Sequence, residues 1–223
     1  MRYKLVIFDW DGTVMDSVPK IVNTLKLAAA SVGVAVPCDE KAAAIIGLSL
    51  DTAVATLFPN DKKYWPELIE AYQYQYVHGD NTATPLFNYA EQYIRQLKAK
   101  GVLLAVATGK GRSGLERMLA QTKLGDCFIT TRTADEAQSK PSPDMIHQIL
   151  DELNVAIDDA VMIGDSLLDM KMAENAGIDA IAMSCGAASA EQLTQSCALA
   201  VCHDYLQLEQ TLQSQHVEAA LCE

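Results

Sequence analysis

The stretch FDWDGTVMDS, residues 8–17, directly follows the apolar run Leu5-Val6-Ile7. An uninterrupted apolar run of this kind is typical of a strand buried on both faces, as in a parallel sheet. Asp9 and Asp11 therefore stand one residue apart at the end of a buried strand, where each carboxylate makes the other costlier to ionise. A counter-charge is expected beside them.

Apolar runs of the same kind recur along the chain and predict a doubly wound α/β fold. Strands are expected at residues 4–8, 102–107, 160–163 and 178–183, with a weaker one at 127–131. Helical patterns are expected at residues 88–100, 113–122, 143–153, 168–176 and 190–196. Strands that alternate with helices in this way form a parallel sheet covered by helices.

The alternation is interrupted once, after the first motif. Roughly seventy residues separate that motif from the next expected strand, far more than one crossover helix requires. Within this interval Ile21, Leu25 and Ala28 recur at helical spacing. We therefore expect an α/β core formed by residues 1–17 and 85–223, and a small inserted helical domain, the cap, formed by residues 18–84.

Composition excludes several classes of protein. With 17 Lys+Arg against 29 Asp+Glu, the formal net charge is -12, which disfavours nucleic acid and anionic membranes as partners. Asp9 ends the first apolar run too early for a signal peptide, and no later window is long enough to span a membrane. We expect a cytoplasmic monomer or dimer. Its six cysteines show no C-x-x-C pair, which favours reduced, mostly packed thiols.

Polar residues end three of the predicted strands. Asp9 follows the first, Thr108 and Gly109 end the second, and Gly164-Asp165 end the third. In an open parallel sheet the carboxyl ends of neighbouring strands converge on one crevice, where ligands bind. Any one of these residues could be a helix cap, but the three together favour a functional site.

The expected crevice has the chemistry of a magnesium site. Asp9, the backbone carbonyl of Asp11 and Asp165 supply hard oxygen ligands, with water completing the set. A metal ion would allow a phosphate dianion to approach this negative site. Lys140, which precedes a predicted helix, would add positive charge.

Four motifs in order resemble a known family: D-x-D-G-T from Asp9, Thr108 at a strand end, K-P-x-P from Lys140, and G-D-x-x-x-D from Gly164 to Asp169. The set is similar to the haloacid dehalogenase (HAD) superfamily, in the phosphatase branch with a helical cap. That branch includes phosphoglycolate phosphatases and β-phosphoglucomutases. The resemblance covers nearly the whole chain and implies a HAD-like Rossmannoid core, a cap, and a phosphoric monoester hydrolase.

The resemblance also implies catalytic roles. Asp9 would be the nucleophile that forms an aspartyl-phosphate, and Asp11 the general acid and base. The Thr108 hydroxyl and the Gly109 amide would hold phosphoryl oxygens, and Lys140 would neutralise charge between Asp9 and the phosphoryl group.

The metal and the substrate complete the implied site. Mg²⁺ would be bound by Asp9, Asp11 and Asp165, with Asp169 contributing directly or through water. The substrate would be a small phosphorylated metabolite such as phosphoglycolate or a sugar phosphate.

In the cap, Gly47 and Ser49 belong to a loop that resembles the substrate-facing loop of this branch. Tyr72 and Tyr76 share a predicted helical face in the cap. Packing is the commoner role of such a stripe, and substrate contact is the alternative.

Two alternative functions stay open. Residues 109–114 read G-x-G-x-x-G, with Asp135 about twenty residues on, as in an NAD(P)-binding module. This motif explains none of Asp9, Asp11, Lys140 and Asp165. A β-phosphoglucomutase-like mutase shares every core residue. Its cap tends to carry an arginine where this chain has Leu50, which favours the phosphatase.

Overall fold

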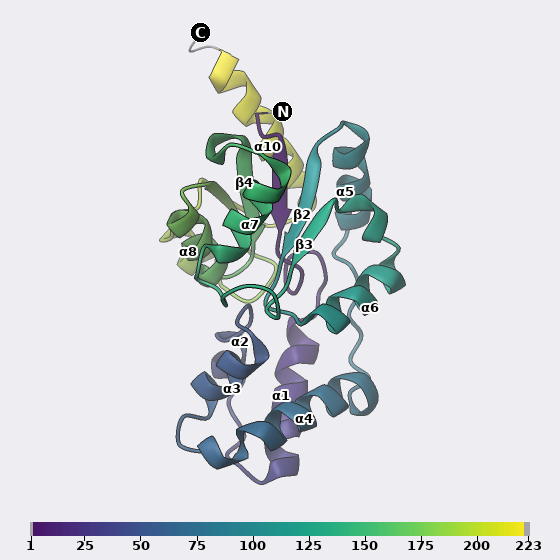
Figure 1. Cartoon of the computed structure of the whole chain (residues 1–223), viewed down its shortest axis with the longest axis vertical. Helices are drawn as coiled ribbons and strands as arrows, with labels where there is room; N and C mark the ends of the chain where they lie inside the picture. Colours follow the sequence, from purple (N-terminus) through teal and green to yellow (C-terminus); the bar gives the residue numbers. More distant parts are fainter. Residues whose placement is uncertain (1, 221–223) are drawn as a thin grey trace.

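The computed structural model describes residues 2–220, in which a parallel sheet and a group of helices lie at opposite ends of the molecule (Figure 1). The strands lie in the order β3-β2-β1-β4-β5-β6, and all neighbouring pairs are parallel. Their bounds are β1 (Leu5–Phe8), β2 (Leu103–Ala107), β3 (Thr130–Arg132), β4 (Ala160–Gly164), β5 (Asp179–Met183) and β6 (Ala200–Cys202). The central strand is β1, where Ile7 pairs in register with Ala105 and Met162.

Helices cover both faces of the sheet, as the doubly wound prediction requires. Successive residues of β1 point to opposite faces: Val6 and Phe8 join one apolar cluster, and Leu5 and Ile7 join the other. The first cluster is packed by α5 (Ala90–Ala99), α6 (Arg112–Thr122) and α10 (Tyr205–Ala220), and the second by α7 (Asp144–Leu153), α8 (Leu167–Ala176) and α9 (Ala190–Thr194). Short 3₁₀ turns occupy Gly125–Cys127 (η3) and Ile157–Asp159 (η4).

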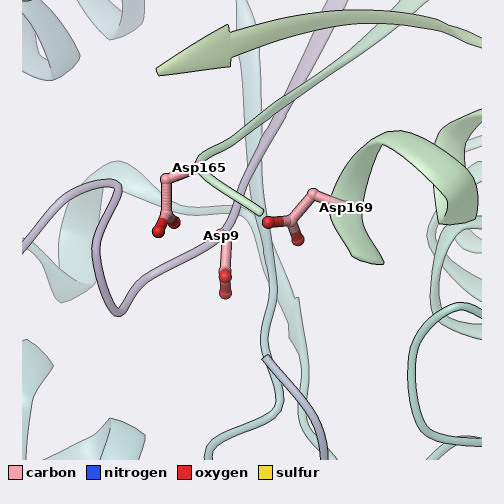
Figure 2. A group of neighbouring side chains, drawn as sticks. All are labelled: Asp9, Asp165 and Asp169. Atoms are coloured by element: carbon pink, nitrogen blue, oxygen red, sulfur yellow. The ribbon is translucent and has the colours of Figure 1, made fainter. Parts of the chain in front are cut away.

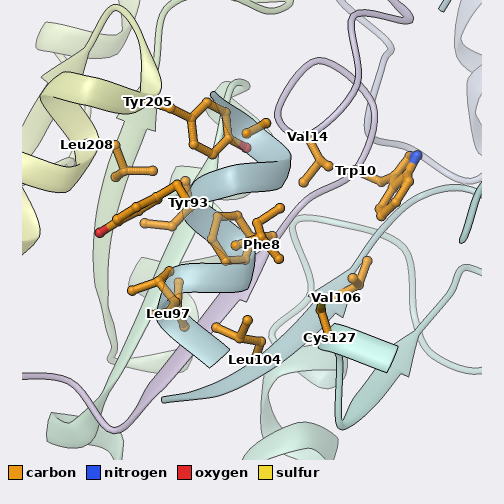
Figure 3. Close-up of a cluster of buried hydrophobic side chains, with 14 of the residues drawn as sticks. Phe8, Trp10, Val14, Tyr93, Leu97, Leu104, Val106, Cys127, Tyr205 and Leu208 are labelled. Carbon is orange, nitrogen blue, oxygen red and sulfur yellow. The ribbon is translucent and has the colours of Figure 1, made fainter. Parts of the chain in front are cut away.

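The loop after β1 is packed into the first apolar cluster. Figure 3 shows Trp10 and Val14 of this loop beside the side chains of β1, β2 and α5. Gly12 has a φ of 79°, a conformation that glycine adopts without steric cost. A Cβ at this position would lie 2.2 Å from a carboxylate oxygen of Asp165, so the loop also requires a residue without a side chain there.

Between this loop and residue 85 the chain forms a separate group of helices, α1 (Val18–Val32), α2 (Asp39–Ala43), α3 (Leu50–Leu57) and α4 (Trp65–Tyr74), with a 3₁₀ turn at Lys62–Tyr64 (η1). A π-helical turn, η2 (Gln75–Gly79), continues α4. The outgoing and returning segments run side by side, because Met15 bridges to Leu86. That residues 18–84 act as a cap domain stays a prediction.

The expected elements of the core are confirmed within a few residues, with three exceptions. The strand expected at 127–131 begins only at Thr130, because residues 125–127 form the 3₁₀ turn η3. Strand β6 and helix α10 were not expected from the sequence. The strand is only three residues long and lies at the sheet edge, which leaves little pattern to detect.

The cysteines depart in part from expectation. Cys127 and Cys202 are buried, but Cys38 and Cys197 are exposed, so the thiols are not mostly packed. The five described cysteines are free, and Cys222 lies outside the described residues. Within residues 2–220, no helix combines the length and apolar character needed to cross a bilayer.

Helix α10 is tied to the loop after β1 by one buried hydrogen bond. The Tyr205 hydroxyl donates to the backbone carbonyl of Thr13 at 2.9 Å, and its ring packs edge-on against Tyr93 at 6.4 Å. We predict that Tyr205→Phe lowers the free energy of unfolding by about 1–3 kcal/mol, because the buried carbonyl loses this donor. Urea denaturation measures the change. Tyr74→Phe, at a side chain that is 62% exposed, is the matched control, and equal stability of the two variants would contradict the prediction.

Candidate active site

The carboxyl ends of β1, β2 and β4 meet at one place, as the sequence predicts. Asp9, Thr108 and Asp165 follow these three strands, and each is only 1% exposed. Figure 2 shows the side chains of Asp9, Asp165 and Asp169 gathered in one place, with Asp169 approaching from α8. One oxygen from each carboxylate lies within 4.8 Å of the others. The sheet therefore gathers three acidic groups that are distant in the sequence.

A buried cation of the chain itself, Lys140, lies among these carboxylates, in the loop before α7. Its ammonium lies 2.9 Å from Oδ1 of Asp9 and 2.7 Å from Oδ1 of Asp169, and its side chain has no exposed area. Asp169 belongs to the first turn of α8, where its Oδ2 accepts hydrogen bonds from the backbone amide and hydroxyl of Ser166 at 3.1 and 2.6 Å. Asp169 thus both caps the helix and holds the lysine.

Asp165 is held by two donors that sequence reasoning did not assign. Its Oδ1 accepts from the Thr13 hydroxyl at 2.6 Å, and its Oδ2 accepts from the Ala187 amide at 2.7 Å. Gly186 lies so close that a Cβ there would be 2.1 Å from Oδ2. Thr13 was visible as the last residue of the first motif, whereas nothing local to the loop after β5 signals contact with Asp165.

The cluster carries more negative than positive charge, since one ammonium faces three carboxylates. Burial is the largest cause that raises the pKa of Asp9, to about 7; Lys140 opposes the rise, and Asp169 and Asp11 add to it. Burial, followed by Asp169 and Asp9, also raises the pKa of Asp165 well above its usual range. Burial disfavours the charge of Lys140, but Asp169 and Asp9 outweigh this and raise its pKa.

These residues fit a divalent cation. A further positive charge would offset the loss of hydration that burial causes at Asp9 and Asp165. It would also reduce the repulsion between their carboxylates. The donors are carboxylate oxygens, which suit Mg²⁺ better than a softer metal. Among the described residues the side chain of Asp11 is not part of this cluster, and that its backbone carbonyl binds the metal stays a prediction.

Asp11 lies instead beside a cation that sequence reasoning did not assign to the site. Its Oδ1 accepts from the Ser17 hydroxyl at 2.7 Å, and its Oδ2 lies 3.0 Å from the ammonium of Lys110. In the sequence Lys110 occupies the first unspecified position, x, of the G-x-G-x-x-G motif at 109–114. Its place two residues after Thr108, at the end of a strand, is the signal that could have identified it.

A cavity of about 470 Å³ lies between the sheet end and the inserted helices. Asp9, Asp11, Thr108 and Gly109 line it from the sheet side, and the loop 47–49 lines it from the other. The loop approaches closely, because a Cβ on Gly109 would lie 2.2 Å from the carbonyl oxygen of Gly47. The Ser49 amide donates to the Ser139 hydroxyl at 3.0 Å, next to Lys140. The cavity is therefore built from both parts of the chain.

The two tyrosines of the predicted helical face, Tyr72 and Tyr76, belong to the cavity wall. Tyr72 and Tyr76 pack against the apolar cluster of the inserted helices and also line the cavity. Arg117 of α6 lines it too, and the sequence analysis assigned this residue no role.

The start of α6 does not favour the dinucleotide alternative. The Arg112 amide in its first turn donates to Oδ2 of Asp135 at 2.6 Å. A pyrophosphate would need such amides at the helix N-terminus, but here a carboxylate of the same chain occupies the position. Asp135 thus caps the helix and is not poised to contact a ribose.

Comparisons with known proteins agree with this geometry. A family model described as haloacid dehalogenase-like hydrolase matches residues 6–183. A phosphoglycolate phosphatase of Rhodospirillum rubrum is 30% identical over 216 residues, which cover 92% of this chain and 89% of the relative. A tyrosine-protein kinase, PtkA, of Mycobacterium tuberculosis is 28% identical over 201 residues, which cover 90% of this chain and 68% of the relative.

Solved structures share the fold. A predicted phosphatase from Clostridium acetobutylicum superposes with a TM-score of 0.84 at 25% identity, over 96% of this chain and all of the other. A protein from Bacteroides vulgatus assigned as a β-phosphoglucomutase superposes with a TM-score of 0.81 at 22% identity, over 95% of this chain and 89% of the other. The second likeness concerns the fold alone.

The buried carboxylates predict stabilisation by Mg²⁺. At a concentration about 100-fold above its dissociation constant, a ligand of the folded state adds about 2.7 kcal/mol, so Mg²⁺ should raise the thermal unfolding temperature measured at constant ionic strength. Asp165→Asn should abolish most of this rise, because it removes a charged donor. Asp126→Asn, at a 63% exposed side chain, is the control and should keep the full rise. The same rise in Asp165→Asn as in the unaltered chain would contradict the assignment.

Proposed function

Because this chain belongs to the haloacid dehalogenase-like hydrolases, we propose that it is a Mg²⁺-dependent phosphatase that hydrolyses a small phosphomonoester, with phosphoglycolate the favoured substrate, through an aspartyl-phosphate. One observation carries the proposal: Asp9 is buried against Lys140 and lines a cavity that it shares with Asp11. The similarity to a phosphoglycolate phosphatase supports the substrate class. We expect a cytoplasmic monomer or dimer.

In the proposed first step, Asp9 attacks phosphorus. The Trp10 amide and the Lys140 ammonium both lie on its Oδ1, at 2.7 and 2.9 Å, so Oδ2 is the oxygen assigned to the attack. The new P–O bond forms as the bond to the ester oxygen breaks, and Asp11 gives its proton to the leaving alkoxide. In the second step water attacks phosphorus, Asp11 takes the water proton, and Asp9 is released with inorganic phosphate.

The remaining residues would hold the phosphoryl group. The Thr108 hydroxyl and the Gly109 amide are assigned to phosphoryl oxygens, and Lys140 to the charge between Asp9 and phosphorus. Mg²⁺, when bound by Asp9, Asp165 and the Asp11 carbonyl with support from Asp169, would add positive charge next to the phosphoryl oxygens. Gly47 and Ser49 would close the cavity and exclude water.

A mutase is the second candidate, because it would use the same core residues. It must grip a second phosphate while its bisphosphate intermediate turns around, which demands a cationic clamp. Leu50 lines the cavity where the cap would carry such an arginine, and Arg117 lines it from the core instead. The phosphatase therefore remains the favoured function.

The nucleophile is tested by Asp9→Asn. The amide keeps the shape of the side chain but cannot attack phosphorus, so release of phosphate from 2-phosphoglycolate in Mg²⁺ should fall by about 1,000-fold or more. Asp39→Asn, at a 70% exposed side chain, should keep full activity. Residual activity of Asp9→Asn within about tenfold of the unaltered protein would contradict the role.

A second measurement separates phosphatase from mutase. The protein is incubated with β-glucose 1-phosphate and a trace of glucose 1,6-bisphosphate, and both glucose 6-phosphate and inorganic phosphate are followed. We expect any turnover to release inorganic phosphate, because Leu50 offers the second phosphate no charge. Steady formation of glucose 6-phosphate faster than inorganic phosphate would instead identify a mutase.

A further inference from the structure

We propose that Lys110 and Tyr76 form the subsite that binds a carboxylate of the substrate, and that they select short phosphoesters with a carboxylate beside the ester-bearing carbon. The inference rests on the proposed function, since it names the substrate class of the same site. It concerns two residues to which the proposed mechanism assigns no step. Both line the cavity, one from the loop after β2 and one from the π-helical turn η2.

Lys110 is a buried cation that lies at the cavity wall, close to the cluster of aspartates. Its side chain is 10% exposed, and its ammonium lies 3.0 Å from Oδ2 of Asp11. Burial of the Lys110 ammonium in this position has a substantial desolvation cost. The neighbouring Asp9 and Asp169 are paired with a different lysine, Lys140. A lysine held at the cavity wall is suited to an anionic group of the substrate other than the phosphate.

Tyr76 presents a buried hydroxyl beside the ammonium of Lys110. Among the described residues, its oxygen makes no hydrogen bond of good geometry, although the Lys110 ammonium lies 5.0 Å from the ring centroid. Burial raises the pKa of this hydroxyl, and the nearby Lys110 ammonium opposes the rise. A buried hydroxyl without a well-aligned partner is unfavourable by up to about 1–3 kcal/mol, so a ligand oxygen would satisfy it. Single π-helical turns occur frequently at functional sites, and Tyr76 lies in the one that continues α4.

Neighbouring side chains hold Tyr76 in position. The ammonium of Lys20 lies 5.0 Å from the centroid of its ring and donates to the carbonyl of Asp80 at 2.8 Å. The ring of Tyr72 lies 5.9 Å away on the same helical face. Two lysine ammoniums thus lie near the Tyr76 ring, and that of Lys110 is also paired with Asp11. This preorganisation reduces the entropy lost when a carboxylate binds.

The geometry also limits the length of the substrate. In the proposed mechanism Asp11 protonates the ester oxygen, which must then lie about 2.6–3.2 Å from its carboxylate. Lys110 contacts the same carboxylate at 3.0 Å. A carboxylate bonded directly to the ester-bearing carbon can therefore reach Lys110 while the ester oxygen stays at Asp11. The glycolate group of 2-phosphoglycolate has this length.

The test compares two substrates of equal length, 2-phosphoglycolate and ethyl phosphate, in which a methyl group replaces the carboxylate. The measured quantity is the ratio of their kcat/KM values. Lys110→Met should lower this ratio by about 10- to 100-fold, the effect of losing a hydrogen bond to a charged group. Tyr76→Phe should lower it by a smaller factor, and Lys110→Arg should restore part of the loss. Lys171→Met, at an exposed lysine paired with Glu174, should leave it unchanged.

The outcomes separate this inference from the proposed function. If Lys110→Met slows both substrates by the same factor, or if the unaltered protein does not prefer 2-phosphoglycolate, the subsite is refuted while the phosphatase stands. If the unaltered protein hydrolyses neither ester, the proposed function fails. Calorimetric binding of the two esters to Asp9→Asn protein, with and without Lys110→Met, then decides the subsite: a preference for 2-phosphoglycolate that Lys110→Met removes supports it, and equal binding overturns it.

Discussion

Three buried carboxylates share one buried ammonium at the end of the sheet, and the surrounding structure compensates for that crowding. Lys140 contacts both Asp9 and Asp169, but one positive charge cannot balance three negative ones. Removing such groups from water is unfavourable unless hydrogen bonds replace those lost. The site supplies them from several elements, including the hydroxyl of Thr13 and the amide of Ala187 on Asp165. The remaining charge imbalance is the physical reason to expect a cation.

The apolar core keeps these groups in place. Strand β1 is buried on both faces, and the loop that carries Asp9 and Asp11 continues into the same cluster through Trp10 and Val14 (Figure 3). Close packing of this kind resists small displacements. The loop therefore cannot shift its carboxylates away from one another, and nearby lysines neutralise part of their charge, Lys140 at Asp9 and Lys110 at Asp11. Close backbone contacts at Gly12 and Gly186 also keep Asp165 in place, since any side chain at either position would displace its carboxylate.

The same loop organises the substrate cavity. It starts the outgoing segment toward α1, and the return segment pairs with it through Met15 and Leu86. Because both connections lie side by side, the inserted helices face the strand ends and bring loop 47–49 against Gly109. In the proposed mechanism the phosphoryl chemistry depends on the sheet, whereas the cavity wall beyond it combines Lys110 of the core with Tyr76 of the inserted segment.

The sequence by itself determined the features that local pattern controls. Continuous apolar runs predicted the strands, and a polar residue directly after each run predicted Asp9, Thr108 and Asp165 at one edge, since parallel strands end together. The spacing of Ile21 and Leu25 predicted helices in the insertion. Edge strand β6 and helix α10 were not predicted, because a three-residue strand and a weakly amphipathic helix show little hydrophobic periodicity. Only the tertiary structure decided which groups meet across the chain: the Ala187 amide with Asp165, the Lys110 ammonium with Asp11, and the Tyr76 ring with the Lys110 ammonium. These pairings join residues far apart in the sequence or set the direction of a side chain, and no local pattern encodes either.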